Sequence, residues 1–320
     1  MSDSPMPSGI LLIDKPEGMT SFSVVSRVRR ILQVKKAGHA GTLDPFATGL
    51  LTVAVGRSTR VLRYMENYSK RYRATMFLGK KTETGDPEGE VVGGKMPTEE
   101  ELLALRENDY RKIKDAVMSF VGEIEQIPSK YSAIKINGRP AYDYARSGQD
   151  VEIPVRKVTI DGIDILRIFE EEGTCLVEME VSCSKGTYIR TLCEDIGEKL
   201  GFGAYCTALR RLSCGKYGID SAFTLEEIEK MQNEGDERFF MDEMTALSDM
   251  PSIEVTQQEA ADMGNGKKLD FCTFKDRMEN IDGIRQGTRV LATFSGRAVA
   301  VIYVEDVDGT LIVREERVLD

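Results

Sequence analysis

The residues best suited to chemistry lie in GHAGTLDPFATGLL, residues 38–51, which holds the only histidine of the chain, His39, and the aspartate Asp44. An Asp-Pro turn by itself is more typical of a turn cap than of a catalytic group. Here Asp44 is surrounded by glycines and apolar residues: Gly38, Gly41, Gly49, Leu43, Phe46 and Leu50. The glycines allow close approach of the backbone to a ligand, and the apolar side chains exclude water. A partly buried carboxylate beside cations is suited to act as a nucleophile or a base.

The segment around this carboxylate is basic although the chain as a whole is acidic. Residues 1–80 carry 13 lysines and arginines against five acidic residues, a net of +8, whereas the whole chain has a net charge of −10. A local patch of cations attracts phosphates even on an acidic protein. The pattern indicates chemistry on a polyanion such as a nucleic acid.

Two further segments combine aromatic rings with arginines. In KRYR, residues 70–73, strand periodicity places Tyr72 opposite the arginines, which predicts a ring in a pocket and guanidinium groups facing phosphate or solvent. A bare run of this kind is more often a solvated strand edge. In SKGTYIR, residues 184–190, Tyr188 and Arg190 lie at a predicted strand-to-helix junction and both reach one cleft. An arginine near the loop carboxylate is expected to keep it ionised.

His39 is either an ordinary core or surface histidine or a flat ring that stacks on an unpaired base. A Ser-His-Asp triad is excluded because no serine stands in a nucleophile elbow. GKKT at residues 79–82 is no Walker A loop, because Ala74 stands where that motif needs glycine, and no G-x-G-x-x-G follows the first strand.

Composition limits the class of protein further. The six cysteines form no C-x-x-C pair, and one histidine is too few for a Cys/His zinc site, so we expect reduced, mostly buried thiols. The N-terminus lacks the features of a signal peptide, and no apolar run approaches the roughly 18 residues of a membrane span. We expect a cytoplasmic protein with no membrane association, metal or cofactor.

Hydrophobic periodicity predicts a mixture of strands and helices up to residue 248. Strands are expected at residues 9–13, 50–55, 71–78, 156–169 and 174–183. Helices are expected after Thr20 or Ser21, after the capping boxes at Thr98 and Thr224, through Ile189, and over residues 207–212. Residues 84–94 are expected to form an exposed loop.

Two segments depart from this pattern. Residues 126–150 contain three tyrosines and two prolines without periodicity, which predicts an excursion from the core that orders on a partner. After residue 248 short strands follow, at residues 288–294, 298–304 and 311–313. We predict two domains, residues 1–248 and residues 249–320, the second small and β-rich.

Six segments together resemble the TruB family of pseudouridine synthases, in the order in which they occur in that family. They are GILLIDKPEGMTS (9–21), AGHAGTLDPFATGLL (37–51), KRYRATMFLG (70–79), YSAIKINGRPAYDYAR (131–146), CSKGTYIRTL (183–192) and ALRRLSCGKY (208–217). The blocks are long and span nearly the whole catalytic part, so the resemblance is specific. Residues 249–320 resemble, more weakly, the PUA RNA-binding module that often follows.

The resemblance implies an α+β fold of the pseudouridine-synthase type, with a mixed, largely antiparallel sheet flanked by helices and a small C-terminal β-rich PUA-like domain. It implies an isomerase that converts uridine 55 in the T-loop of tRNA to pseudouridine. The position that matches the catalytic aspartate is Asp44. The match further implies that Tyr72 stacks on the target base, that Arg190 pairs with the aspartate, and that Tyr188 lines the pocket.

Three more positions carry roles by resemblance. Leu209 matches an apolar pocket residue, His39 matches a residue that holds the RNA loop open, and Lys15 matches a residue that supports the catalytic loop. The reaction needs no metal, redox cofactor or nucleotide triphosphate. The target uridine must leave its stack to reach a buried carboxylate.

Residues 126–150 match the thumb-like insertion that clasps the T-arm in the stand-alone bacterial enzymes. The expected partner is therefore tRNA, bound by a monomer that requires no protein partner. A guide-RNA-dependent ribosomal RNA synthase, a non-catalytic RNA-binding or tRNA chaperone protein, and a small-molecule enzyme are the alternatives. The acidic tail, residues 305–320, predicts little phosphate binding by the PUA-like domain.

Overall fold

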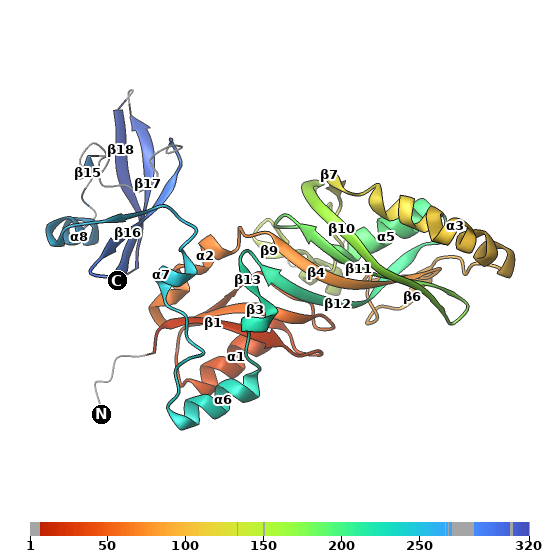
Figure 1. Ribbon diagram of the computed structural model, residues 1–320, viewed down its shortest axis with the longest axis horizontal. Helices are drawn as coiled ribbons and strands as arrows, with labels where there is room; N and C mark the ends of the chain where they lie inside the picture. Colours follow the sequence, from red (N-terminus) through yellow and green to blue (C-terminus); the bar gives the residue numbers. More distant parts are fainter. Residues whose placement is uncertain are drawn as a thin grey trace.

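The structure, a computed structural model, describes residues 7–132, 134–149, 151–265, 267, 269–270, 285–307 and 310–319. Over these residues the chain folds as α+β, with a nine-stranded sheet flanked by helices and a five-stranded sheet near the C-terminus (Figure 1). This confirms the predicted fold class. The predictions that concern Cys272, Asp308 and Asp320 fall outside the described residues.

The large sheet has the order β1-β3-β12-β4-β11-β10-β7, with β2 paired to β3 and β13 paired to β12. Its strands are β1 (Gly9–Lys15), β2 (Ala37–Ala40), β3 (Thr48–Val55), β4 (Lys70–Leu78), β7 (Gly122–Gln126), β10 (Arg156–Glu171), β11 (Thr174–Cys183), β12 (Ala204–Cys214) and β13 (Tyr217–Gly218). Every pairing in it is antiparallel except the short one between β12 and β3. The sheet is thus mixed and largely antiparallel, as predicted.

Helices and short turns connect and cover these strands. They are α1 (Ser21–Ile31), η1 (Gly56–Arg60), α2 (Leu62–Met65), α3 (Glu99–Met118), α5 (Ile189–Leu200), η2 (Ile219–Ser221), α6 (Leu225–Glu234) and α7 (Glu243–Ala246). Both predicted capping boxes are present, at Thr98 before α3 and at Thr224 before α6. Residues 107–110 interrupt α3 with non-helical backbone, so it consists of two helical segments. Among the described residues, no helix is both long and apolar enough to cross a bilayer.

β1 separates two hydrophobic cores because both of its faces are apolar. Leu11 and Ile13 pack into the core beneath α1 and α6, while Ile10 and Leu12 pack into a core on the other face. That second core also contains Leu291 and Val301 from the C-terminal sheet. The five cysteines that the structure describes are buried and free, in agreement with the prediction.

One local prediction was wrong. Residues 207–212, expected to be helical, lie in β12, where the chain fills the space between β3 and β4. Contacts with distant segments override the local propensity there. Residues 84–94, expected to be an exposed loop, are mostly exposed and connect the short strand β5 (Lys81–Thr82) to β6 (Val91–Gly93), which they include. Within this segment Gly85 and Asp86 are buried, and Asp86 is only 3% exposed.

The C-terminal sheet has the order β14-β16-β17-β18-β15 and packs with the helix α8. Its elements are β14 (Ser252–Glu254), α8 (Gln257–Gly264), β15 (Leu269–Asp270), β16 (Arg289–Phe294), β17 (Arg297–Val307) and β18 (Thr310–Val318). The three strands predicted here are present. Part of the acidic tail is neutralised internally, since Glu316 pairs with Arg289 at 2.6 Å and with Arg63 at 3.3 Å.

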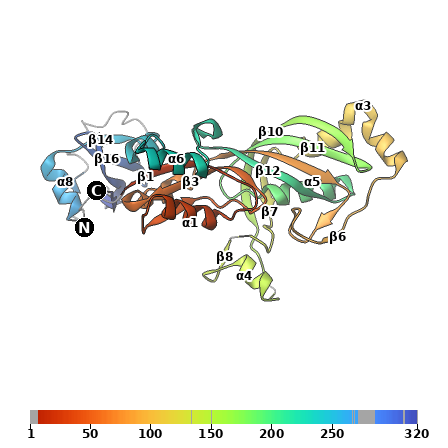
Figure 2. The same cartoon turned by 90° about the horizontal axis from the view of Figure 1, so that it is seen from below.

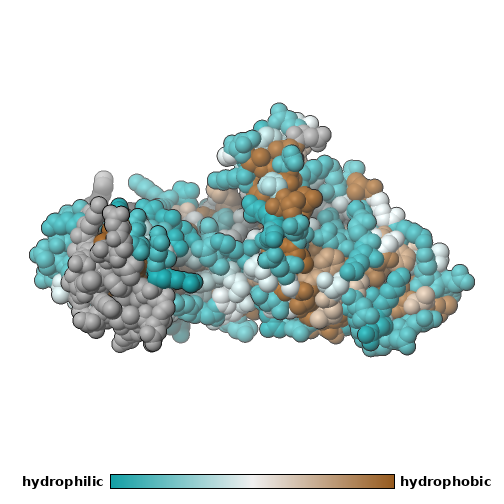
Figure 3. Space-filling model, turned by 90° about the horizontal axis from the view of Figure 1, so that it is seen from above, coloured by the Kyte–Doolittle hydropathy of each residue, from teal (hydrophilic) through white to brown (hydrophobic). Residues whose placement is uncertain are grey.

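Within the predicted insertion, residues 126–150, residues 134–149 leave the body as a projection (Figure 2). It contains β8 (Lys135–Ile136), β9 (Arg139–Pro140) and the helix α4 (Ala141–Arg146). Ala133 and Asp150 fall outside the described residues. In Figure 3 the projection stands out as a ridge on which apolar and hydrophilic residues lie side by side.

Candidate functional site

The loop that carries Asp44 connects β2 to β3, and buried polar side chains bind its backbone through hydrogen bonds. Ser21 bonds the backbone of Leu43 twice, as acceptor from its N–H at 2.9 Å and as donor to its carbonyl at 3.1 Å. Lys15, fully buried, donates through Nζ to the carbonyls of Pro16, Pro45 and Ala47 at 2.8, 3.1 and 2.6 Å. Lys15 thus contacts the loop at three carbonyls, and its supporting role stays a prediction.

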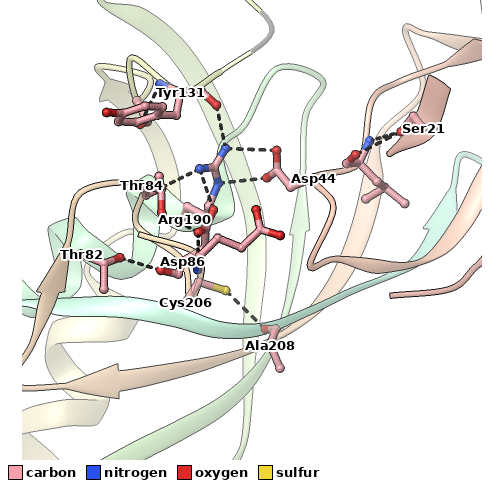
Figure 4. Close-up of polar contacts among 12 residues, drawn as sticks. Ser21, Asp44, Thr82, Thr84, Asp86, Tyr131, Arg190, Cys206 and Ala208 are labelled. Atoms are coloured by element: carbon pink, nitrogen blue, oxygen red, sulfur yellow. Dashed lines mark hydrogen bonds and ion pairs between the residues drawn. The ribbon is translucent and has the colours of Figure 1, made fainter. Parts of the chain in front are cut away.

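Arg190, at the start of α5, faces Asp44 across the cleft (Figure 4). Its Nε lies 2.9 Å from Oδ2 and its Nη2 lies 3.1 Å from Oδ1 of Asp44. This two-pronged contact fixes the plane of the carboxylate as well as its charge. The predicted pairing of Arg190 with the loop aspartate is present in the structure.

Asp86 is a second carboxylate on the same arginine, and the sequence analysis missed it. Its Oδ2 lies 3.0 Å from Nη1 of Arg190, and its Oδ1 accepts from the hydroxyl of Thr84 and from the N–H of Glu88. The same Nη1 also donates to the carbonyl of Thr84 at 2.5 Å. The turn-rich composition around Asp86 concealed this role, because only its distance to Arg190 in the fold reveals it.

The sequence predicted that an arginine keeps the Asp44 carboxylate ionised, but the pKa of Asp44 is raised. Burial raises the pKa of Asp44, Arg190 opposes that shift, and the neighbouring Asp86 adds to it. The net direction is upward, so the arginine offsets the burial only in part. The physical reason is that one guanidinium serves two carboxylates in a site from which water is largely removed.

A cleft of about 950 Å³ opens in front of Asp44. Its walls include all the pocket residues predicted from the sequence: Tyr72, Tyr188, Arg190, Leu209 and His39. Cations lie around the same cleft: Lys70, Lys135, Arg156, Lys157 and Lys185. The site therefore joins a negative centre to a basic surround, which suits a substrate that carries phosphates.

The apolar part of the cleft comes from the sheet. Tyr72 on β4 and Leu209 on β12 are each 8% exposed, and burial raises the pKa of the Tyr72 phenol. The arginines on either side of Tyr72 are exposed, as predicted, and both also pair with Glu180 on β11. The strand thus alternates as predicted.

Tyr188 and His39 both line the cleft. The backbone N–H of Tyr188 donates to Oε1 of Gln126 at 3.1 Å, and its carbonyl accepts from Nε2 of Gln126 at 3.2 Å. Gln126, unnoticed in the sequence, therefore fixes the junction before α5. His39 is half-buried on β2, its Nδ1 has no hydrogen-bond partner among the described residues, and burial followed by Arg211 lowers its pKa.

Within the described residues, no group of three or more histidine, cysteine, aspartate or glutamate side chains is placed to hold a metal ion. The ionisable groups next to Asp44 include Arg190, which it shares with Asp86, and the cleft also holds two phenols, the cations named above and the imidazole of His39, whose pKa is lowered. Such a set can perform carboxylate chemistry on a base or sugar that is brought out of solvent.

Comparisons with known proteins agree with this geometry. Residues 29–189 match the family model described as "TruB family pseudouridylate synthase (N terminal domain)", and residues 190–250 match "tRNA pseudouridylate synthase B C-terminal domain". A relative from Corynebacterium diphtheriae, named tRNA pseudouridine synthase B, is 44% identical over 84% of this chain and 87% of its own. One of the same name from Syntrophotalea carbinolica is 40% identical over 92% of this chain and 91% of its own.

Among solved structures, the archaeal box H/ACA sRNP Nop10-Cbf5 complex contains a similar chain. It aligns with a TM-score of 0.70 and 25% identity over 99% of this chain and 89% of that one. A chain in an H/ACA RNP bound to a substrate RNA containing 2'-deoxyuridine aligns with a TM-score of 0.69 and 25% identity over 98% of this chain and 85% of its own.

Proposed function

The chain belongs to the TruB family of pseudouridylate synthases, and we propose on that premise that it isomerises uridine 55 in the T-loop of tRNA to pseudouridine. The observation that carries the proposal is the carboxylate of Asp44, held by two contacts from Arg190 in a cleft of about 950 Å³. Relatives at 40–44% identity are named for the tRNA reaction, and this favours it over a guided reaction on ribosomal RNA.

The reaction breaks the bond from C1′ to N1 of uracil, turns the base, and joins C1′ to C5. The proton lost from C5 is matched by one gained at N1, so no oxidant, reductant or metal enters the balance. Asp44 serves as the catalytic carboxylate in its ionised form. Direct attack on C1′ and a glycal intermediate both use this same group.

The target nucleotide reaches Asp44 only after it leaves its stack, at a cost of a few kcal/mol. Tyr72 offsets part of this cost by stacking on the flipped base, and Leu209 and Tyr188 enclose it. His39 fills the space that the base vacates in the RNA loop. Arg190 and Lys15 hold the carboxylate and its loop in place while the base turns.

Residues 126–150 grip the T-arm. The projection holds Tyr142 and Tyr144, each beneath an arginine at 5.3 and 4.6 Å from the ring centre, and so offers rings and cations to an RNA backbone. With this grip the chain works as a monomer in the cytoplasm, without a guide RNA or a protein partner. The C-terminal sheet, residues 249–320, acts as a PUA-like domain with a secondary part in RNA binding.

The test is tritium release from T-arm RNA that carries 5-³H-uridine, without added metal or guide RNA, for the wild type and Asp44→Asn. We expect release by the wild type and none above background by Asp44→Asn, with RNA affinity largely retained. Substantial release by the variant would remove Asp44 from the mechanism. Tight binding without release by the wild type would favour a guided enzyme or an RNA-binding protein, and no binding would favour a small-molecule enzyme.

A further inference from the structure

Arg211 on β12 is a buried cation that the proposed reaction has not yet used. Its side chain is 2% exposed and lines the cleft, and no carboxylate among the described residues forms an ion pair with it. Its described hydrogen bonds go to backbone, from Nε to the carbonyl of Leu50 at 2.6 Å and from Nη2 to that of Gly41 at 3.0 Å. These bonds occupy Nε and Nη2, but they do not cancel the charge of the guanidinium.

The two carbonyls that Arg211 holds stand on either side of the Asp44 loop, Gly41 at its entry and Leu50 at its exit. The backbone of Arg211 lies close to the same exit, because β12 pairs Arg211 with Gly49 on β3. Gly49 has φ +99°, and a Cβ there would lie 2.3 Å from the carbonyl oxygen of Arg211. Main chain and side chain of one residue therefore fix both stems of the loop.

On its other side β12 pairs Arg211 with Tyr72 on β4. Both residues line the cleft, and the positive charge of Arg211 lowers the pKa of the Tyr72 phenol against the larger, opposite effect of burial. One side chain thus connects the loop that carries the carboxylate with the strand that carries the stacking ring. Lys15 makes no such connection, since its described bonds go to Pro16 and to the tip of the loop.

We propose that Arg211 is a positioning residue for the isomerisation. It sets the placement of Asp44 relative to Tyr72. It also gives a positive charge to the floor of the cleft, that is, to residues 41–50 together with Arg190 and Arg211. The inference rests on the proposed function. A guanidinium fork reaches the two stems of the loop through two separate nitrogens, whereas the ammonium of lysine donates from one point and cannot reproduce both positions, so lysine keeps the charge but not the geometry. The two parts of the proposal, geometry and charge, are therefore separable by substitution.

The geometric part is tested with Arg211→Lys, with Arg210→Lys as the matched control. Arg210 neighbours Arg211 on β12 and pairs with Asp14 at 2.7 Å. We expect Arg211→Lys to lower the single-turnover rate on T-arm RNA by on the order of 100-fold, because a misplacement of about 1 Å has that effect. RNA affinity and the rate of Arg210→Lys should stay near wild type. A wild-type single-turnover rate for Arg211→Lys would overturn the positioning role.

The charge is tested on His39, the only histidine of the chain and so the source of a single imidazole signal in NMR. Arg211 is the charged group that acts on His39 among the described residues, and on β3 the ring faces apolar Val53. The wild-type pKa should lie below the ordinary 6.5 and should rise in Arg211→Met, whereas Arg211→Lys should leave it low. If Arg211 had a purely structural role, Arg211→Lys would not slow the reaction while leaving the His39 pKa low.

An unchanged His39 pKa in Arg211→Met would contradict the electrostatic part. If that variant does not fold, a wild-type His39 pKa at or above 6.5 contradicts it equally. The titration needs no RNA and no turnover. Failure of the wild type to release tritium would therefore count against the proposed function. The His39 titration would still show whether the charge of Arg211 acts on the cleft.

Discussion

The floor of the cleft and the projection formed by residues 134–149 are built in opposite ways. Bonds on the floor join distant parts of the chain: Arg190 to Asp44 spans 146 residues, and Arg211 to Gly41 spans 170. The hydrogen bonds described for the projection join residues at most ten positions apart, as from Arg139 to Gln149. The floor is therefore fixed by the whole fold, whereas the projection is held by its own sequence and can adjust to RNA as a unit.

This contrast predicts that changes on the floor affect the chemical step, and the largest effect after loss of Asp44 is expected at Asp86. Asp86→Asn leaves Arg190 with one full anionic partner and shifts the guanidinium away from its present position. We expect the single-turnover rate to fall by on the order of 100-fold with little change in RNA affinity. Asp109→Asn, which removes an exposed partner of Lys114, is the control and should be silent.

The pH profile of Asp86→Asn tests whether Asp86 raises the pKa of Asp44. In the proposed mechanism Asp44 works ionised, so we expect activity to be lost as the pH falls through its pKa, which burial and Asp86 raise above the ordinary 3.8. Removing the charge of Asp86 lowers that pKa, and the acid limb of the single-turnover rate should move to lower pH. An acid limb of the rate profile that stays at the same pH, or moves to higher pH, would show that Asp86 does not raise the pKa of Asp44.

Alanine substitutions at two glycines, one in each region, compare how tightly the floor and the projection are packed. Gly49 on the floor and Gly138 in the projection both have positive φ, +99° and +83°, but a Cβ at Gly138 meets nothing within 4 Å. Gly138→Ala should cost about 1–2 kcal/mol, from backbone strain alone. Gly49→Ala should cost at least ~2 kcal/mol more, because the Cβ also meets the backbone of Arg211. Equal losses in thermal unfolding would refute the claim that the floor is the tighter region.

The smallest effect is expected in the projection. Arg146→Gln removes a cation that lies 5.3 Å above the ring of Tyr142, and we expect RNA affinity to fall roughly 3- to 10-fold, with a salt dependence shallower by about one phosphate contact. The rate at saturating RNA should not change. Arg167→Gln, which also removes a guanidinium stacked on a ring, that of Phe169, is the control. A slower chemical step in Arg146→Gln alone would mean that the projection shapes the floor.

The features that sequence predicted well are those fixed by neighbours along the chain. The capping boxes at Thr98 and Thr224 and the alternation around Tyr72 need only a few adjacent residues, and all three are present. The candidate residues lie together, but their roles stay predictions. Asp86 was missed, and residues 207–212 were assigned to a helix. Both depend on partners more than 100 residues away, which no local pattern encodes.

The position of β12 in the sheet has a consequence for synthesis. β3 and β4 follow one another in the sequence yet do not pair, and β12, which begins at Ala204, lies between them. It is joined to β3 through two residue pairs only. A nascent chain that ends before β12 already contains Asp44, Tyr72 and Arg190 but lacks the strand that joins their two halves of the sheet. We therefore expect the cleft to be one of the last parts around this sheet to form, after long-range pairing that makes folding slow.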